Sequence, residues 1–415
     1  MSALAKIIAD NRGGLKRGIP SYCTAHPETL SAIFAAYRGD NAPILIEATC
    51  NQVNQLGGYT GMTPSGFRRF VEELALREGV DRSRLILGGD HLGPNPWKNE
   101  PASDAMQKAR DMVAAYVDAG FTKIHLDASM ACADDGLLPE ETMATRAAEL
   151  CAVAERGARS ELLYVIGTEV PIPGGETGDV DALAVSRPEA VERTWALHRQ
   201  AFAVRDLSGA LDRVVGVVVQ PGVDFGNDRV FAFAPAEAGE LSKTLDRFPD
   251  VVFEAHSTDY QSGAALAALV AGHFAILKVG PELTFAYRQA IVALAGIEAA
   301  MCVARPSGIV DAIRSEMTGS PDHWRAYVAQ GPREDAMMLY GLSDRVRYYW
   351  PRPAIQAAVA ALHANLAAAA PEPGLVAQFT GGLVEDAGEP ATLVRRVVER
   401  MVGEVVKKYR GAAAS

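Results

Sequence analysis

Short apolar runs recur along the chain, and each is followed by polar or glycine-rich residues and then by a helical pattern. The runs are nearly continuous rather than alternating, which is typical of parallel strands whose outer face is covered by helices. They predict eight strands: Gly18–Cys23, Ile44–Cys50, Leu85–His91, Lys123–Ser129, Leu162–Glu169, Val214–Gln220, Val251–His256 and Ala275–Gly280.

The segments between these runs have the periodicity of helices. Several begin with proline, which suits the first helical turn. The predicted helices are Pro64–Glu78, Ser103–Ala119, Glu140–Arg156, Pro188–Leu207, Pro235–Phe248 and Gly263–Ala271. Repeated strand–helix units of this kind predict an α/β fold, a (β/α)₈ TIM barrel.

The chain continues for more than one hundred residues after the eighth strand. This part contains the alanine-rich helix formers Ala354–Ala370 and a second predicted helix, Pro390–Lys408. The only proline-rich stretch between them is a short loop, whereas a separate domain usually needs an exposed linker. We therefore expect a barrel over residues 1–300 and, over 301–415, a helical extension packed on the barrel.

Composition restricts the possible partners and the compartment. The net charge of -11 and a pI near 5.3 argue against nucleic acid, whose binding depends on Lys and Arg at phosphates. No apolar run is long enough for a membrane span, and the N-terminus predicts a helix rather than a signal peptide. The five cysteines show no CxxC spacing, which favours reduced thiols in the cytoplasm.

The C-terminal ends of barrel strands are where active sites lie in this fold. Here these ends carry acidic, amide, hydroxyl, lysine and histidine side chains, and three of the eight histidines lie on or beside them. The candidates are Glu47, Asn51, Asp90, His91, His125, Asp127, Glu169, Gln220, Glu254, His256, Ser257, Thr258, Lys278 and Gly280.

The residue types favour a metal and proton-transfer site. His91, His256 and Glu169 form a plausible N,N,O ligand set for a catalytic divalent ion. Gly88 and Gly89 precede Asp90 and predict a close approach of the backbone to another group. Structural roles remain open at this point: Lys278 can be a buried ion-pair partner of Glu47 or Glu254, and Asp127 can cap the following helix.

Long motifs in the chain resemble the GatZ/KbaZ family. They are EATCNQVNQ at 47–55, GGYTGM at 57–62, GDHLGP at 89–94, HLDASM at 125–130, GTEVPIPGGE at 167–176, EAHSTDYQ at 254–261, KVGPELT at 278–284 and SDRVRYYWP at 343–351. The resemblance covers nearly the whole chain. It implies the accessory, non-catalytic subunit of a class II tagatose-1,6-bisphosphate aldolase, in galactitol and N-acetylgalactosamine catabolism, partnered by a separate catalytic chain.

Other activities are attached to the same family. Metal-dependent 4-epimerisation of ketose phosphates, interconverting fructose 6-phosphate and tagatose 6-phosphate, is the alternative that the resemblance implies. An older kinase label has no support from the residues, because the chain contains no GxxxxGK[ST] segment.

The similarity to zinc-dependent class II aldolases implies roles for individual residues. By that pattern Asp90 is the acid/base and His91 and His256 bind the metal. The pattern expects a third histidine after the sixth strand, where this sequence has Gln220. Glu169 or Gln220 would then complete the coordination, and Asp127 and Glu169 are further candidates for catalysis. The implied cofactor is zinc, with manganese, nickel or magnesium as alternatives.

The expected ligand is a ketose phosphate, and we also expect a homo-oligomer. Phosphates bind after strands 7 and 8 in many such barrels. Arg345 or Arg347 from the extension can close over the phosphate as a bidentate fork, or can simply lie on a solvated helix face. The predicted substrate- and phosphate-binding residues are Glu47, Asn51, Ser257, Thr258, Lys278, Gly280 and Arg345.

Overall fold

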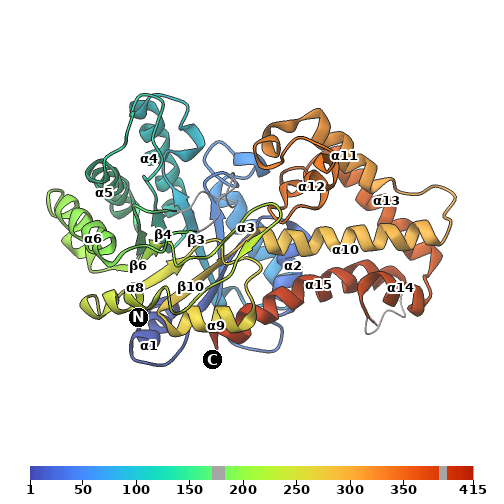
Figure 1. Ribbon diagram of the computed structural model, residues 1–415, viewed down its shortest axis with the longest axis horizontal. Helices are drawn as coiled ribbons and strands as arrows, with labels where there is room; N and C mark the ends of the chain where they lie inside the picture. Colours follow the sequence, from blue (N-terminus) through green and yellow to red (C-terminus); the bar gives the residue numbers. More distant parts are fainter. Residues whose placement is uncertain (171–182, 383–389, 415) are drawn as a thin grey trace.

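The computed structural model describes residues 1–170, 183–382 and 390–414, and its centre is a closed barrel of eight parallel strands (Figure 1). Each strand pairs with the next along the chain, and the eighth pairs with the first. The predicted (β/α)₈ barrel is confirmed. The barrel strands are β1 Ile19–Cys23, β2 Ile44–Thr49, β3 Leu85–Leu92, β4 Lys123–Leu126, β5 Leu163–Ile166, β6 Val214–Val219, β9 Val252–Ala255 and β10 Phe274–Val279.

Helices cover the outside of the barrel. They are α2 Pro27–Ala35, α3 Pro64–Arg77, α4 Ala102–Asp118, α5 Glu140–Gly157, α6 Pro188–Ala203, α7 Ser208–Leu211, α8 Gly239–Thr244 and α9 Gly263–Ala271. α2 was not among the predicted helices; its N-cap is His26, a less familiar signal than Ser, Thr, Asp or Asn. A short hairpin, β7 Asp224–Phe225 and β8 Val230–Phe231, follows β6.

The predicted helix Pro235–Phe248 was wrong in its extent. Only Gly239–Thr244 is α-helical, and a 3₁₀ turn, Leu245–Arg247, follows. The segment before it is tied down elsewhere, because the backbone N–H of Phe233 donates to the side chain of Gln261 at 2.9 Å. The chain therefore turns before it can enter the helix.

The N-terminal end of the barrel is closed by an apolar plug. α1 Ala3–Arg12 places Leu4, Ile7 and Ile8 against the lowest interior residues of the strands, which include Ile19, Leu45, Val215 and Val252. All of these side chains are buried. Polar side chains in the barrel are therefore confined to the C-terminal half of its interior.

The C-terminal part is helical: α10 Pro281–Ala300, α11 Ile309–Gly319, α12 Glu334–Tyr340, α13 Pro353–Ala369, α14 Pro373–Thr380 and α15 Pro390–Ala413. In Figure 1, α10 runs away from the barrel and α15 returns, so that the two chain termini lie on the same side. α15 packs against α2, α9 and β1. The last helix thus completes the outer layer of the barrel between α2 and α9. We infer that residues 1–300 and 301–415 form one folded unit.

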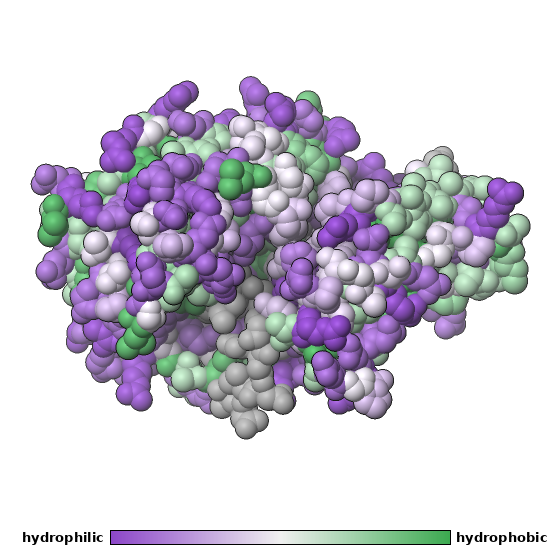
Figure 2. Space-filling view, turned by 90° about the horizontal axis from the view of Figure 1, so that it is seen from above, coloured by the Kyte–Doolittle hydropathy of each residue, from purple (hydrophilic) through white to green (hydrophobic). Residues whose placement is uncertain are grey.

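Figure 2 shows the far end of this extension as a narrower lobe with many apolar and weakly polar residues at its surface. Within the described parts of the chain, no helix is both long and apolar enough to cross a membrane.

Candidate metal and sugar-phosphate site

A layer of buried charges crosses the barrel interior above the apolar plug. Lys123 Nζ on β4 lies 2.6 Å from Glu47 Oε1 on β2 and 2.7 Å from Glu254 Oε2 on β9. Lys278 on β10 also pairs with Glu47. Glu47, Lys123 and Glu254 are fully inaccessible to solvent. Burial by itself would lower the pKa of Lys123, but Glu254 and Glu47 outweigh it and raise that pKa.

Gly88 makes room for this charge layer. It lies beside Glu47 in the register of β2 and β3 and beside Lys123 in that of β3 and β4. A Cβ atom at position 88 would lie 2.7 Å from both Cγ and Oε1 of Glu47. At Gly89, a Cβ would meet Leu92 and Tyr116 instead. The two glycines therefore bring the backbone close to protein side chains: Glu47 at position 88, and Leu92 and Tyr116 at position 89.

Asp90 connects the charge layer to the histidines. Its Oδ1 lies 2.8 Å from Lys278 Nζ and 2.9 Å from His125 Nδ1. Burial raises the pKa of Asp90, but the opposing effects of His91, Lys278 and His125 hold that pKa well below its usual range. Asp90 is therefore an ionised carboxylate at neutral pH, with its second oxygen 3.7 Å from His91 Nε2.

Three histidines form a triangle at the C-terminal ends of β3, β4 and β9. The ring centroids of His91 and His256 are 4.8 Å apart, and His125 lies 5.1 and 5.3 Å from them. Burial lowers the pKa of His256 to about 3, so its ring is neutral and keeps a lone pair for a cation. The structure thus brings together the two histidines expected from the sequence and adds His125 to them.

His91 is held in a special backbone conformation. It has a φ of 51°, in the left-handed region that few residues other than glycine adopt, and it lies within the register shift between Gly89 and Leu92 of β3. Its Nδ1 lies 2.7 Å from Asp127 Oδ2, while Asp127 Oδ1 accepts hydrogen bonds from the N–H and hydroxyl of Ser129. Asp127 therefore orients the His91 ring, as carboxylates behind metal-binding histidines do, and does not cap a helix.

The donor set fits a divalent cation. Asp90, His125, Glu254 and His256 each offer a ligand atom, and these atoms lie within 4.8 Å of one another. Nε2 of His125 is buried and has no hydrogen-bond partner in the parts of the chain that the structure describes. Four buried carboxylates (Glu47, Asp90, Asp127 and Glu254) face only two lysines in this cluster, so two negative charges remain when the histidines are neutral. A divalent ion would balance them.

Two of the predicted ligands lie outside this cluster. Glu169 is exposed beyond the end of β5, and its Oε2 accepts a 2.5 Å hydrogen bond from the Ser186 hydroxyl. The side-chain oxygen of Gln220 accepts hydrogen bonds from the backbone N–H groups of Gly222 and Val223, so it closes a turn. The sequence places both residues after neighbouring strands, but neither side chain reaches the histidines.

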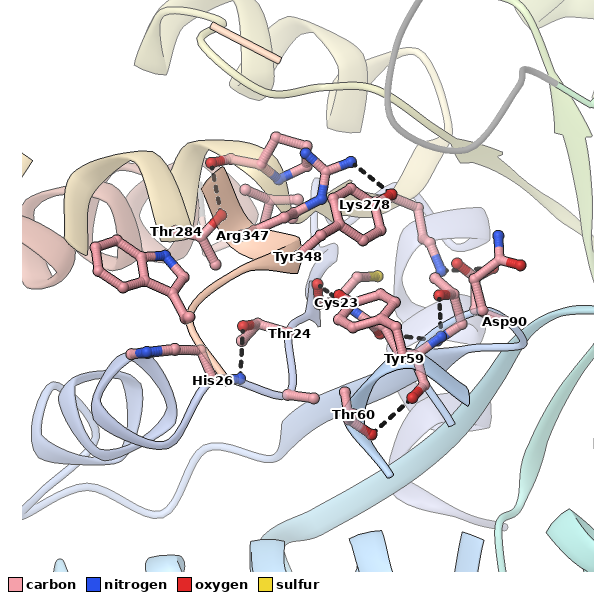
Figure 3. Close-up of a pocket in the computed structure, with 18 of the residues that line it drawn as sticks. Cys23, Thr24, His26, Tyr59, Thr60, Asp90, Lys278, Thr284, Arg347 and Tyr348 are labelled. Carbon is pink, nitrogen blue, oxygen red and sulfur yellow. Dashed lines mark hydrogen bonds and ion pairs between the residues drawn. The ribbon is translucent and has the colours of Figure 1, made fainter. Parts of the chain in front are cut away.

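A cavity of about 310 Å³ opens above the cluster (Figure 3). Asp90, His91, His256 and Lys278 line it, and so do the predicted residues Asn51, Ser257 and Gly280. Thr258 is not among the lining residues: its hydroxyl donates to the backbone oxygen of Lys278 at 2.6 Å and contacts the Tyr409 hydroxyl at 3.1 Å. Thr258 therefore joins β10 to α15 and is unsuited to phosphate binding.

The expected phosphate contact at the Gly280 backbone is already occupied. The N–H groups of Gly280 and Glu282, at the start of α10, donate to Asp259 Oδ1 at 3.0 and 2.8 Å. Burial raises the pKa of Asp259 to about 7, although these two N–H groups lower it. A carboxyl group of the protein thus stands where an anion would bind.

The extension supplies the wall of the cavity opposite the barrel. Arg347, Tyr348, Trp350 and Pro351 line it, whereas the predicted Arg345 does not. The Arg345 side chain lies between aromatic rings, 3.7 Å from the Tyr327 centroid and 4.6 Å from that of Tyr348. Figure 3 shows Arg347 and Tyr348 above Cys23 and Tyr59, with Asp90 on the other side of the view. Of the two arginines considered from the sequence, Arg347 is the one at the cavity.

Lys123 was missing from the predicted site, and His125 and Glu254 were candidates at strand ends without an assigned role, although the sequence contained a signal for all three. Lys123, His125 and Asp127 alternate along β4 and so point to one face of the strand, as Glu254 and His256 do at the end of β9. In a closed barrel that face is the interior.

Comparison with known proteins gives the family. The profile of the family described as D-tagatose-1,6-bisphosphate aldolase subunit GatZ/KbaZ-like matches residues 4–414. The chain belongs to the GatZ/KbaZ-like family. It is 45% identical over 417 residues to the D-tagatose-1,6-bisphosphate aldolase subunit GatZ of Escherichia coli, covering 98% of this chain and 99% of that one. The corresponding protein of Shigella flexneri is 44% identical over the same shares.

One solved structure is similar to this chain over nearly its whole length. A probable tagatose 6 phosphate kinase from Sinorhizobium meliloti 1021 is 45% identical, with a TM-score of 0.86 over 95% of this chain and 100% of that one. The similarity spans the barrel and the helical extension of this GatZ/KbaZ-like chain.

Proposed function

We propose that this chain is the accessory subunit of a class II D-tagatose-1,6-bisphosphate aldolase and works beside a separate catalytic chain. The observation that carries the proposal is the 45% identity to the GatZ subunit over nearly the full length of both chains. The proposal places the protein in the cytoplasm, as a homo-oligomer serving galactitol and N-acetylgalactosamine catabolism.

The extension offers a surface for such a partner. Its projecting lobe has exposed apolar side chains, including Phe379, which is 41% exposed, and Ala360, Ala367 and Ala368 (Figure 2). Apolar residues gathered at a projecting end are typical of protein interaction sites.

Co-expression with the catalytic aldolase chain tests the subunit role. We expect the pair to co-purify at a fixed ratio and the catalytic chain to keep its tagatose-1,6-bisphosphate cleavage longer at elevated temperature. Phe379→Glu should weaken this effect, whereas Leu137→Glu, at an exposed leucine on the barrel, should not. Cleavage with the same rate and lifetime in the presence and absence of this chain would contradict the subunit role.

A second function is supported by the buried cluster: metal-dependent 4-epimerisation of a ketose phosphate by breaking and remaking the C3–C4 bond. His125, Glu254 and His256 would hold the ion, with Asp90 and His91 beside them; zinc is our first expectation, and manganese, nickel or magnesium are alternatives. Once bound, such an ion polarises a ketose carbonyl and its neighbouring hydroxyl.

The protein's own residues provide the remaining chemistry. Asp90 is ionised at the cavity and can accept the proton of the C4 hydroxyl, which opens the C3–C4 bond. Returning that proton after re-addition to the other carbonyl face gives the 4-epimer, whereas release of the fragments gives aldol cleavage. Lys278, 2.8 Å from Asp90, stabilises the carboxylate and keeps it from retaining the proton.

Assays with the purified chain distinguish these reactions. Fructose 6-phosphate incubated with the chain and a divalent metal should give tagatose 6-phosphate, and His125→Ala with His256→Ala should lose both the metal and the turnover. Triose phosphates from tagatose 1,6-bisphosphate would indicate an aldolase instead. If the purified chain contains no metal and converts neither sugar, only the subunit role remains. This chain lacks the phosphate-loop motif, so we do not propose a kinase activity for it from the description of the Sinorhizobium meliloti protein.

A further inference from the structure

Two arginines lie beside the cavity without a carboxylate partner. Within the described ranges, neither Arg345 nor Arg347 makes an ion pair. Arg345 donates to the backbone oxygen of His323, and Arg347 donates to the backbone oxygens of residues 343 and 344. Both guanidinium carbons lie 4.6 Å from the ring centroid of Tyr348. Two like charges held this close favour an anion between or beside them.

Two buried N–H donors on the same segment have no hydrogen-bond partner among the described residues. Arg345 is only 4% exposed, and its Nη1 is unsatisfied. Trp350 is 1% exposed, lines the cavity, and has an indole Nε1 that is also unsatisfied. Buried donors normally find acceptors, so the unsatisfied indole N–H of Trp350, which lies at the cavity, indicates a missing ligand atom there. The Arg347 guanidinium reaches the Tyr348 hydroxyl at 3.2 Å, which places that hydroxyl in the same group (Figure 3).

We propose that residues 345–350 form an anion site for one phosphate monoester, with Arg347 and Trp350 contacting the phosphate and Arg345 supporting Tyr348 from behind. A phosphate monoester carries close to two negative charges at neutral pH, which match the two arginines. At the other end of the cavity, the carboxylate-rich cluster matches a divalent cation. A ligand that fits both ends has a phosphate at one end and a metal-binding carbonyl and hydroxyl at the other.

One end of the cavity suits a phosphate group. Arg347 and Lys278 are the only lysine or arginine side chains that line it in the described parts of the chain, and Lys278 is already paired with Glu47 and Asp90. A second phosphate would meet no unpaired cation there. The preferred substrate class is therefore a ketose monophosphate rather than a bisphosphate. This substrate class rests on the proposed ketose-phosphate function; the anion site does not.

Calorimetric titration of the full chain tests the anion site. Inorganic phosphate, after removal of metals with a chelator, and fructose 6-phosphate should both bind, and Arg347→Gln should weaken both about 10- to 100-fold, the range for a lost charged hydrogen bond. Arg352→Gln is the matched control: Arg352 is exposed two residues beyond the 345–350 segment and does not line the cavity, so this variant should bind phosphate as tightly as the unmodified chain. Equal effects of the two variants, or no phosphate binding by the unmodified chain, would overturn the site.

Three further measurements test the indole contact, the possibility of misfolding and the preference for a monophosphate. Trp350→Phe removes the indole N–H but keeps an aromatic ring, and should weaken phosphate about two- to tenfold. Binding of unphosphorylated fructose should not change in Arg347→Gln, which distinguishes a lost phosphate contact from misfolding. Fructose 1,6-bisphosphate binding more than about tenfold tighter than the monophosphate would overturn the monophosphate preference. Absence of metal or turnover with intact phosphate binding would reject the proposed epimerisation and leave this site standing.

Discussion

Lys123→Met is expected to lower the free energy of unfolding by about 3–5 kcal/mol, the cost of leaving buried charges without their partner. Lys123 is inaccessible and lies between Glu47 and Glu254. Methionine has a similar length but no charge. Glu47 keeps Lys278 after the change, but Lys123 is the closest cation to Glu254, whose next one is Lys278 at 3.9 Å. Glu47, Glu254 and Asp90 would then share the one ammonium group of Lys278 in a dry interior.

Chemical denaturation of the purified variants measures this loss. Lys108→Met is the control, because Lys108 pairs with Glu100 at 2.6 Å but both side chains are 37% exposed. Its free energy of unfolding should change by no more than about 0.5 kcal/mol. A loss in Lys123→Met as small as in the control would mean that water or a shifted side chain compensates Glu47 and Glu254.

The second large effect is expected for Asp90→Asn. Turnover of fructose 6-phosphate should fall by about 10²-fold or more, because the amide cannot accept the proton of the sugar hydroxyl. The shape of the residue is nearly unchanged, and Lys278 keeps Glu47 as an ion-pair partner. The fold should therefore persist, with a melting temperature close to that of the unmodified chain.

Three measurements on this variant define the role of Asp90. Turnover, melting temperature and metal content are recorded together, with Asp111→Asn on the exposed surface of α4 as the control. Lost turnover with retained metal supports proton transfer, whereas lost turnover together with lost metal makes Asp90 a ligand. Full turnover removes Asp90 from the mechanism, and a lower melting temperature with intact turnover makes it structural. Support of a catalytic partner chain should not change in any of these cases.

Most of the barrel could be predicted from local patterns. Apolar runs such as Val214–Val219 are buried on both faces, so their composition alone identifies them as strands of a covered parallel sheet. The ends of elements were less predictable. The strand predicted as Leu162–Glu169 is regular only from Leu163 to Ile166, because hydrogen bonding to the neighbouring strands, which a single segment does not encode, decides where a strand stops.

The site was predicted only in part, because local patterns identify strand ends but not the contacts between them. Asp90, His91 and His256 lie at strand ends and were expected there, since all parallel strands end at the same rim. The position of a residue at the rim does not tell which other rim residues its side chain contacts. Glu169 follows its strand in the same way but is exposed, whereas His125 lies within the triangle of histidines. Which side chains turn inward depends on bulges and loop paths, such as the left-handed backbone of His91.

The sequence by itself determined the barrel, the rim that carries the polar residues and the presence of histidine and carboxylate side chains at that rim. Each of these depends on residue type and short-range spacing. Only the tertiary structure decided which of these residues meet. Lys278 and Glu47 are 231 positions apart and pair across the barrel, and Gly88 gives Glu47 its space. Arg347 rather than Arg345 reaches the cavity, because the turn Arg345–Tyr348 packs against α10 and α12 and lies with Arg347 at the cavity. Such contacts arise from chain closure over long separations, which no local pattern of residues specifies.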